Sequence, residues 1–151
     1  MKIRNVLVLA LAVVAAVAAT GCGHLMMMMH RSDVARPAHT EFGIGPRSSA
    51  SRQFTATLQP DQPLRPRRMQ PVRVAITDAA GAPVEHATIR IDGGMPEHGH
   101  GLPTQPRVRR ALGGGVYEIE GLRFNMGGWW ELKLAIESPA GADDVVFNLS
   151  L

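Results

Sequence analysis

Residues 130–136 read Trp130-Glu131-Leu132-Lys133-Leu134-Ala135-Ile136, with an apolar side chain at every second position. A period of two places neighbouring side chains on opposite faces of a β-strand. One face of this segment is therefore apolar, while the other carries Glu131 and Lys133. Antiparallel sheets commonly bury one face and leave the other in water. The stretch predicts a strand that covers a core on one side only.

The same alternation recurs along the chain, at the spacing of about 8 to 12 residues that is typical of all-β domains. Turn signals such as Asp78-Ala79-Ala80-Gly81 and Gly113-Gly114-Gly115 separate the runs. No segment keeps a helical period over a convincing length. The pattern predicts an antiparallel β-sandwich over residues 52–151, which are enough to bury a core without disulfides. Its seven strands are expected at 54–58, 72–77, 87–92, 108–112, 116–120, 130–136 and 145–151.

The N-terminus has the features of a secretory signal, because Lys2 and Arg4 precede an uncharged apolar run over residues 6–19. The run leads into Ala19-Thr20-Gly21-Cys22, which resembles the lipobox of bacterial lipoproteins. This resemblance implies that residues 1–21 are a removed signal peptide and that Cys22 is acylated and anchors the chain. Cys22 is the only cysteine, so it has no internal disulfide partner, which agrees with a covalent role of this kind.

An uncleaved transmembrane anchor is the alternative. Residues 6–19 are short for a membrane span, although residues 20–29 add little charge and could extend the run. Residue 23 is Gly and not Asp, which by resemblance to lipoproteins gives no signal for retention in the inner membrane. We expect a lipid-anchored protein of the cell envelope that faces the periplasm, with the outer membrane favoured over the inner.

A methionine-rich segment follows the cysteine. Its soft or borderline ligands suit Cu(I), and they are His24, Met26, Met27, Met28, Met29 and His30. The alternative is that these flexible apolar side chains lie against the lipid surface beside the anchor. Residues 31–51 then mix Arg, Ser, Pro, Gly and Ala with few large apolar groups. Residues 22–51 are therefore predicted to be a lipidated, flexible and disordered tether.

The net charge of +3 and the pI of 9.7 invite a nucleic-acid hypothesis, which the distribution of charge opposes. Residues 31–73 hold eight arginines and three acids, dispersed among Pro and Ser. Residues 74–151 hold six basic and ten acidic residues. The basic stretch lacks the interleaved aromatic side chains that stack on bases, so we expect no nucleic-acid partner.

The least ordinary stretch is the loop over residues 93–106, in which Met95, His98 and His100 lie among glycines and prolines. His98 and His100 are one residue apart, so on an extended segment both project to one side. Met126 lies in a second glycine-rich loop. Two imidazoles and one or two thioethers suit copper, with Glu97 as an oxygen ligand or as the partner of a ligand.

The alternative for this loop is structural. The histidines would hold the loop shape through backbone hydrogen bonds, while Met95 and Met126 pack in the core.

Two adjacent tryptophans follow the second glycine-rich loop. Trp130 is in phase with Leu132 and is the core candidate, whereas Trp129 points the other way. Trp129 could cover a copper site or a partner surface, although ordinary edge packing is the more common role of such a residue.

Two further features carry smaller predictions. Tyr117, which lies within Gly115-x-Tyr117, is expected to bond the backbone of a turn in the manner of a tyrosine corner. Arg107, Arg109 and Arg110 are expected to form a solvated face.

Several of these motifs form one longer pattern. It consists of Met95-Pro96-Glu97-His98-Gly99-His100-Gly101 with Pro103-Thr104, then Gly115-x-Tyr117, Gly121-Leu122-x-Phe124, Met126 and Gly128-x-Trp130-Glu131-Leu132. The pattern, over about residues 70–151, resembles the YtkA-like domain, which is related to FixH. The resemblance implies an envelope-anchored immunoglobulin-like β-sandwich without catalytic residues. FixH-type members are associated with the assembly of copper-containing cytochrome oxidases. This chain departs from FixH in having a lipobox in place of a clear transmembrane anchor.

No arrangement typical of an enzyme is present in the sequence. The serines cluster in the tether, the single cysteine is the expected lipid site, and no histidine has an acidic partner at motif spacing. The residues therefore predict a binding module and not an enzyme. Two functions remain open: copper binding in the service of copper handling or oxidase assembly, or metal-free binding of another envelope or respiratory-complex protein.

Overall fold

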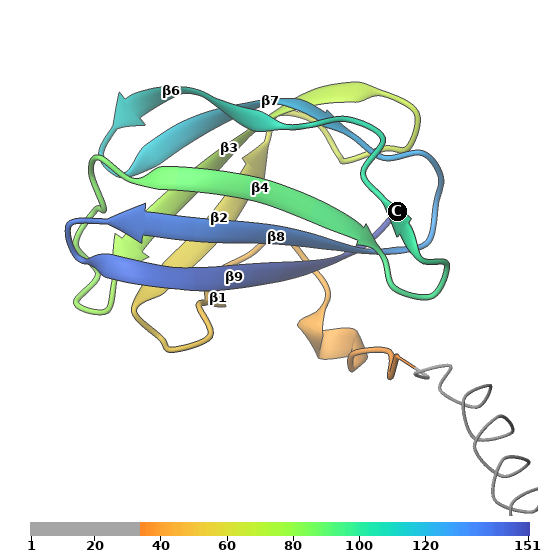
Figure 1. Ribbon diagram of the computed structural model, residues 1–151, viewed down its shortest axis with the longest axis horizontal. Coiled ribbons are helices and arrows are strands. Elements are labelled where there is room, and N and C mark those ends of the chain that lie inside the picture. The colour runs from red at the N-terminus through yellow and green to blue at the C-terminus, as the bar shows by residue number, and fades with distance from the viewer. Residues whose placement is uncertain (1–33) are drawn as a thin grey trace, which may run out of the picture. The chain divides into compact units, whose positions relative to one another are not determined.

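The computed structural model describes residues 34–151, and these form an antiparallel all-β fold (Figure 1). One short 3-10 helix, η1 (His39–Glu41), precedes nine strands. The strands are β1 (Arg47–Ser48), β2 (Phe54–Pro60), β3 (Met69–Asp78), β4 (Thr88–Met95), β5 (His100–Gly101), β6 (Arg107–Gly113), β7 (Val116–Arg123), β8 (Trp129–Ser138) and β9 (Gly141–Ser150). The expected signal peptide 1–21, Cys22 and the Met/His segment 24–30 lie outside the described residues.

All seven predicted strands are present, but they belong to one continuous sheet and not to two separate ones. The order is β1-β2-β3-β7-β6-β4-β8-β9, with β5 paired to β4. The seam between β6 and β4 rests on a single registered pair, Arg90 and Arg107. At the far edges the Ala50 N–H donates to the Asp144 carbonyl at 2.9 Å, so the sheet curls into a nearly closed, barrel-like form.

The core lies inside this curved sheet, where the inward positions of the alternating strands meet. Val72, Val74 and Ile76 of β3 are buried, and so are Leu132, Leu134 and Ile136 of β8. Trp130 is fully buried in the same cluster, in T-shaped contact with Phe124 at a ring separation of 5.2 Å. The prediction that Trp130 belongs to the core is confirmed.

The sheet extends further toward the N-terminus than the strand pattern indicates. We call residues 36–51 the strap. Within it β1 pairs with β2, Phe42 bridges Asn148, and the Gly43 N–H donates to the Asn148 carbonyl at 2.9 Å. These contacts lie within the stretch expected to be tether, before the expected domain start at residue 52. Backbone hydrogen bonds hold the strap, so side-chain alternation gives no signal for it.

Two turns at the end of the sheet where β3 ends and β4 and β7 begin use the expected chemistry. The Tyr117 hydroxyl donates to the Val84 carbonyl at 2.7 Å and accepts from the Ala87 N–H at 2.9 Å, which confirms the predicted bond to a turn backbone. Asp78 caps its own turn by accepting from the Ala80 and Ala82 N–H groups. Among the residues that the structure covers, no helix is long and apolar enough to cross a membrane.

Candidate functional site

The candidate copper residues lie at one end of the barrel-like sheet, where β2, β4, β7 and β9 end and β3, β6 and β8 begin. This is the right-hand end in Figure 1, and we call it the histidine end. Residues 93–101 form its central feature, which we call the histidine hairpin. Here β4 turns back into β5, pairing Gly94 with Gly101 and Met95 with His100.

Close backbone approach explains the two glycines that begin the hairpin. A Cβ atom added at Gly93 would lie 2.4 Å from the Glu131 carbonyl oxygen, and one added at Gly94 would lie 2.6 Å from the His100 carbonyl oxygen. Only glycine leaves room for β8 on one side and β5 on the other. The turn is closed by the Met95 carbonyl, which accepts from the His98 and Gly99 N–H groups at 3.0 and 2.8 Å.

His98 and His100 lie close together on the surface of the protein. Both are exposed, and their rings lie nearly parallel with centroids 6.1 Å apart. Residues directly opposite in an antiparallel pair project to the same face, so the side chain of Met95 starts from the same face as that of His100. Metal–nitrogen bonds are about 2 Å long and lie in the plane of the imidazole ring, so a shared ion requires these stacked rings to rotate toward each other.

The two methionines differ in exposure. Met95 is 1% exposed and belongs to the core, where its methyl group fills the space beside Gly128. Met126 is 41% exposed on the 124–128 loop, and its carbonyl accepts from the Trp130 indole N–H at 3.0 Å. The contact between Met95 and Gly128 places both loops at the histidine end, as the sequence anticipates.

Glu97 and Trp129, the expected supporting residues, contact the strap. The Glu97 carboxylate pairs with Arg36 at 3.4 Å, and the Arg36 guanidinium lies over the Phe42 ring at 5.5 Å. The rings of Phe42 and Trp129 meet edge to face with their centroids 6.3 Å apart. The Trp129 indole N–H donates to the Asn148 side-chain oxygen at 2.9 Å. Trp129 is 1% exposed, so the indole that faces away from the core is covered by the strap.

Arg36 and Phe42 are contacts that sequence reasoning missed. Both lie in a segment without alternation, and both meet partners more than fifty positions away in the chain. A depression of 730 Å³ beside the hairpin was also missed. Met69, Leu102, Thr104 and Arg107 are among its lining residues, and the Thr104 hydroxyl is buried without a hydrogen-bond partner among the described residues.

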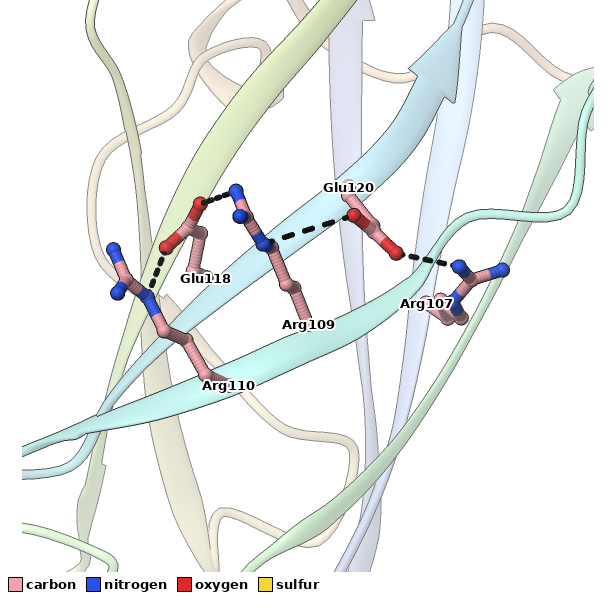
Figure 2. Close-up of polar contacts among 5 residues, drawn as sticks. All are labelled: Arg107, Arg109, Arg110, Glu118 and Glu120. Carbon is pink, nitrogen blue, oxygen red and sulfur yellow. Dashed lines mark hydrogen bonds and ion pairs between the residues drawn. The ribbon is translucent and has the colours of Figure 1, made fainter.

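Arg107, Arg109 and Arg110 form the solvated face that the sequence predicts, in a ladder of ion pairs across β6 and β7 (Figure 2). Arg110 lies 2.6 Å from Glu118, and Arg107 lies 2.6 Å from Glu120. The hydrogen bond from Arg110 lowers the pKa of the Glu118 carboxyl, with further help from Arg109. All three arginines are exposed, so the ladder is a charged outer face.

The described residues, 34–151, contain no group of three or more His, Cys, Asp or Glu side chains that could hold a metal ion. The donor set at the histidine end is therefore two exposed imidazoles, with the Met95 thioether in the core and the Met126 thioether on the second loop. This composition fits a soft monovalent copper ion better than zinc, which prefers three or four nitrogen, thiolate or carboxylate ligands.

Comparisons with known proteins agree with the sequence motifs. A family model described as YtkA-like matches residues 48–135, which is more than half of the chain. The matched region starts at β1 and includes the whole histidine hairpin. It begins and ends earlier than the motifs alone suggest. Neither the comparison with curated proteins nor the comparison with solved structures gives a match. On the strength of the family model, the chain belongs to the YtkA-like family.

Proposed function

We propose that this protein is a lipid-anchored, non-enzymatic binding module of the cell envelope that holds copper at the histidine hairpin. The observation that carries the proposal is the pairing of Met95 with His100 across the hairpin, with the His98 ring 6.1 Å from the His100 ring. Copper is the cofactor with the best match to this donor set, and Met126 is the further thioether. Glu97 and Trp129 support the site from the side of the strap.

In this proposal the fold is a variant of the immunoglobulin-like β-sandwich. The half-sheet β2-β3-β7-β6 faces the half-sheet β4-β8-β9, and a single residue pair joins them at the seam. Such a scaffold holds loops at its end on rigid strands, which is a common arrangement for binding sites. The resemblance to FixH suggests the context, copper handling or the assembly of a respiratory oxidase, with an envelope protein as the partner.

The test is titration of the protein with Cu(I) against a competing chelator. We expect the His98→Ala, His100→Ala double variant to lose affinity by at least tenfold. Met95→Leu keeps the side-chain volume in the core and removes the thioether, and Met126→Leu removes the exposed thioether of the second loop. His86→Asn is the matched control, because His86 is exposed at the other end of the sheet and Asn tolerates its φ of 58°.

Equal affinity in the wild type and the double histidine variant would disprove the copper site. Loss of affinity only when Met26, Met27, Met28 and Met29 are replaced would assign copper to the N-terminal Met/His segment, which also includes His24 and His30. The metal content of protein taken from its own envelope would identify the ion that it carries in the cell.

The anchor has a separate test. Replacement Cys22→Ser should abolish acylation and leave the protein soluble or unprocessed, while the wild type fractionates with membranes and favours the outer one. Unchanged membrane extraction of the variant would instead indicate an uncleaved transmembrane anchor.

A second function is favoured by the burial of Met95. A methionine that is 1% exposed and fills the space beside Gly128 acts as a core residue, and the hairpin then needs no metal to keep its shape. In that case the protein is a metal-free module that binds another envelope protein, and the histidines stay in water. Pull-down of the same partner by wild type and by the double histidine variant, with no copper bound to either, would favour this function.

A further inference from the structure

We propose that the histidine end of the sheet is a docking surface for an anionic membrane, so that the site faces the lipid to which the chain is anchored. The observation is a cluster of arginines that the copper proposal does not use. Arg65, Arg67 and Arg68 lie on the loop between β2 and β3, and Arg123 ends β7. All four are exposed, and none has an ion-pair partner within residues 34–151.

Register and loop contacts place these arginines on one surface. Met69 pairs with Arg123 across β3 and β7, and the Arg67 N–H donates to the Phe124 carbonyl at 2.7 Å. Met69, which is next to Arg68 in the chain and directly opposite Arg123, is 62% exposed, more than any other large apolar side chain among residues 34–151. It lines two depressions, one reaching toward Leu102 beside the histidine hairpin and the other toward Arg65 and Arg68.

The acids nearby do not cancel this charge. Asp61 is paired with Arg73, and Glu120 is paired with Arg107. The opposite end of the sheet has the reverse character, because Asp78, Glu85, Asp143 and Asp144 lie at or beside its strand ends and turns. Positive charge is therefore concentrated at the histidine end of the sheet and negative charge at the opposite end. A negatively charged surface would attract the histidine end and repel the other.

Chain length adds an independent reason to choose a membrane as the occupant. Arg36 is held at the histidine end by its ion pair with Glu97. Thirteen residues lie between it and Cys22, so the two are at most about 50 Å apart along an extended chain. This step rests on the proposed lipid anchor. It keeps the arginine surface close to the bilayer, where basic side chains around exposed apolar groups are the usual composition of an interfacial contact.

The experiment measures binding to vesicles by the chain from residue 22 with Cys22→Ser, so that no lipid anchor contributes. Vesicles of phosphatidylcholine and phosphatidylglycerol in about equal parts are compared with vesicles of phosphatidylcholine alone. The test variant is Arg65→Gln, Arg68→Gln, Arg123→Gln. The matched control has the same change in net charge away from this surface, Arg52→Gln, Arg90→Gln, Arg110→Gln.

We expect the test variant to lose binding to the anionic vesicles by about fivefold per arginine, on the order of 100-fold in all. The control should lose much less, and neither variant should change binding to neutral vesicles. Wild-type binding should also weaken as salt is added, which tests the surface without any variant.

Equal losses in the two variants would overturn the proposal, because net charge and not this surface would then be responsible. Salt-insensitive wild-type binding would also overturn it. Binding to polyglutamate without binding to anionic vesicles would replace the membrane with an acidic protein partner. Because Cys22 is replaced throughout, failure here is distinct from failure of the anchor, which acylation tests, and from failure of the copper site, which the chelator titration tests.

Discussion

At the scale of a residue, the hydroxyl of Tyr117 shows how a single side-chain atom can join two distant segments of the chain. It connects β7 to the segment before β4 by bonding both the Val84 carbonyl and the Ala87 N–H. The Gly115-x-Tyr117 pattern predicts a bond to a turn, but it does not identify which turn. The partners lie about thirty positions upstream and are found only once the chain has folded.

Replacement Tyr117→Phe should lower the free energy of unfolding by about 1–3 kcal/mol, because it leaves the buried Val84 carbonyl and the half-buried Ala87 N–H without a partner. Urea unfolding followed by far-UV circular dichroism measures the change. Ser150→Ala, which removes an exposed hydroxyl, should change stability much less. A loss no greater than in this control would show that the hydroxyl bonds do not contribute.

Two adjacent residues illustrate what phase can and cannot predict. Alternation correctly assigns Trp130 to the core and Trp129 to the other face of β8. It cannot show that Trp129 is also buried, because the cover is Phe42 of the strap, which lies far away in sequence. Burial on the outer face of a sheet depends on a second segment, and no local pattern encodes that contact.

At the scale of an element, the cover that the strap places over Trp129 can be tested directly. Phe42→Ala should uncover the Trp129 indole and lower stability by about 1–3 kcal/mol, the range for an aromatic side chain that is only partly buried. Acrylamide quenching of tryptophan fluorescence should become stronger in the variant. Ile44→Ala is the control, since the Ile44 side chain is already 40% exposed. Quenching that is equal in both would mean that Phe42 does not shield Trp129.

The far end of the strap is fastened by a carboxylate whose protonation can be followed. Asp143 accepts hydrogen bonds from the Ser49 side chain and from the backbone N–H groups of Asp144, Ser51 and Gln53, and these lower its pKa below the ordinary value of 3.8. A lowered pKa in the folded state means that the contribution to stability is complete above the ordinary value. It is lost as the pH falls through the lower folded pKa.

We therefore expect Asp143→Asn to be less stable than the wild type at neutral pH, with the difference shrinking as the pH falls below 3.8. Urea midpoints measured across this range provide the test. Asp144→Asn is the neighbouring control, because the Asp144 carboxylate is exposed and makes no hydrogen bond within residues 34–151. A difference between wild type and Asp143→Asn that is constant with pH would contradict this account.

At the scale of the whole molecule, the weak point of the sheet is the seam between β6 and β4. β8 is paired with β4 on one side and with β9 along its whole length on the other, whereas β6 shares only one residue pair with β4. Amide hydrogens in β6 should therefore exchange faster than those in β8, because local opening needs fewer hydrogen bonds to break. Hydrogen exchange with mass spectrometry can compare the two strands. Equal protection of their amides would disprove the claim that the sheet is weakest between β6 and β4.

Charge is also organised at this scale. The sequence shows more arginine before residue 73 and more acid after it, which suggests a basic tether and an acidic domain. Folding rearranges that division, because the loop with Arg65, Arg67 and Arg68 belongs to the domain and meets Arg123 at the histidine end. The resulting polarity runs from one end of the sheet to the other, and not from tether to domain.

The amino-acid sequence by itself determined the strand content, the inward face of each long strand and the position of the histidine loop. These follow from a period of two and from turn residues, which act over a few neighbours. The tertiary structure decided the closure into one sheet, the pairing of Met95 with His100, the cover over Trp129 and the gathering of arginines. Each of these depends on hydrogen-bond register or packing between distant segments, and such contacts form only when the whole chain encloses its core.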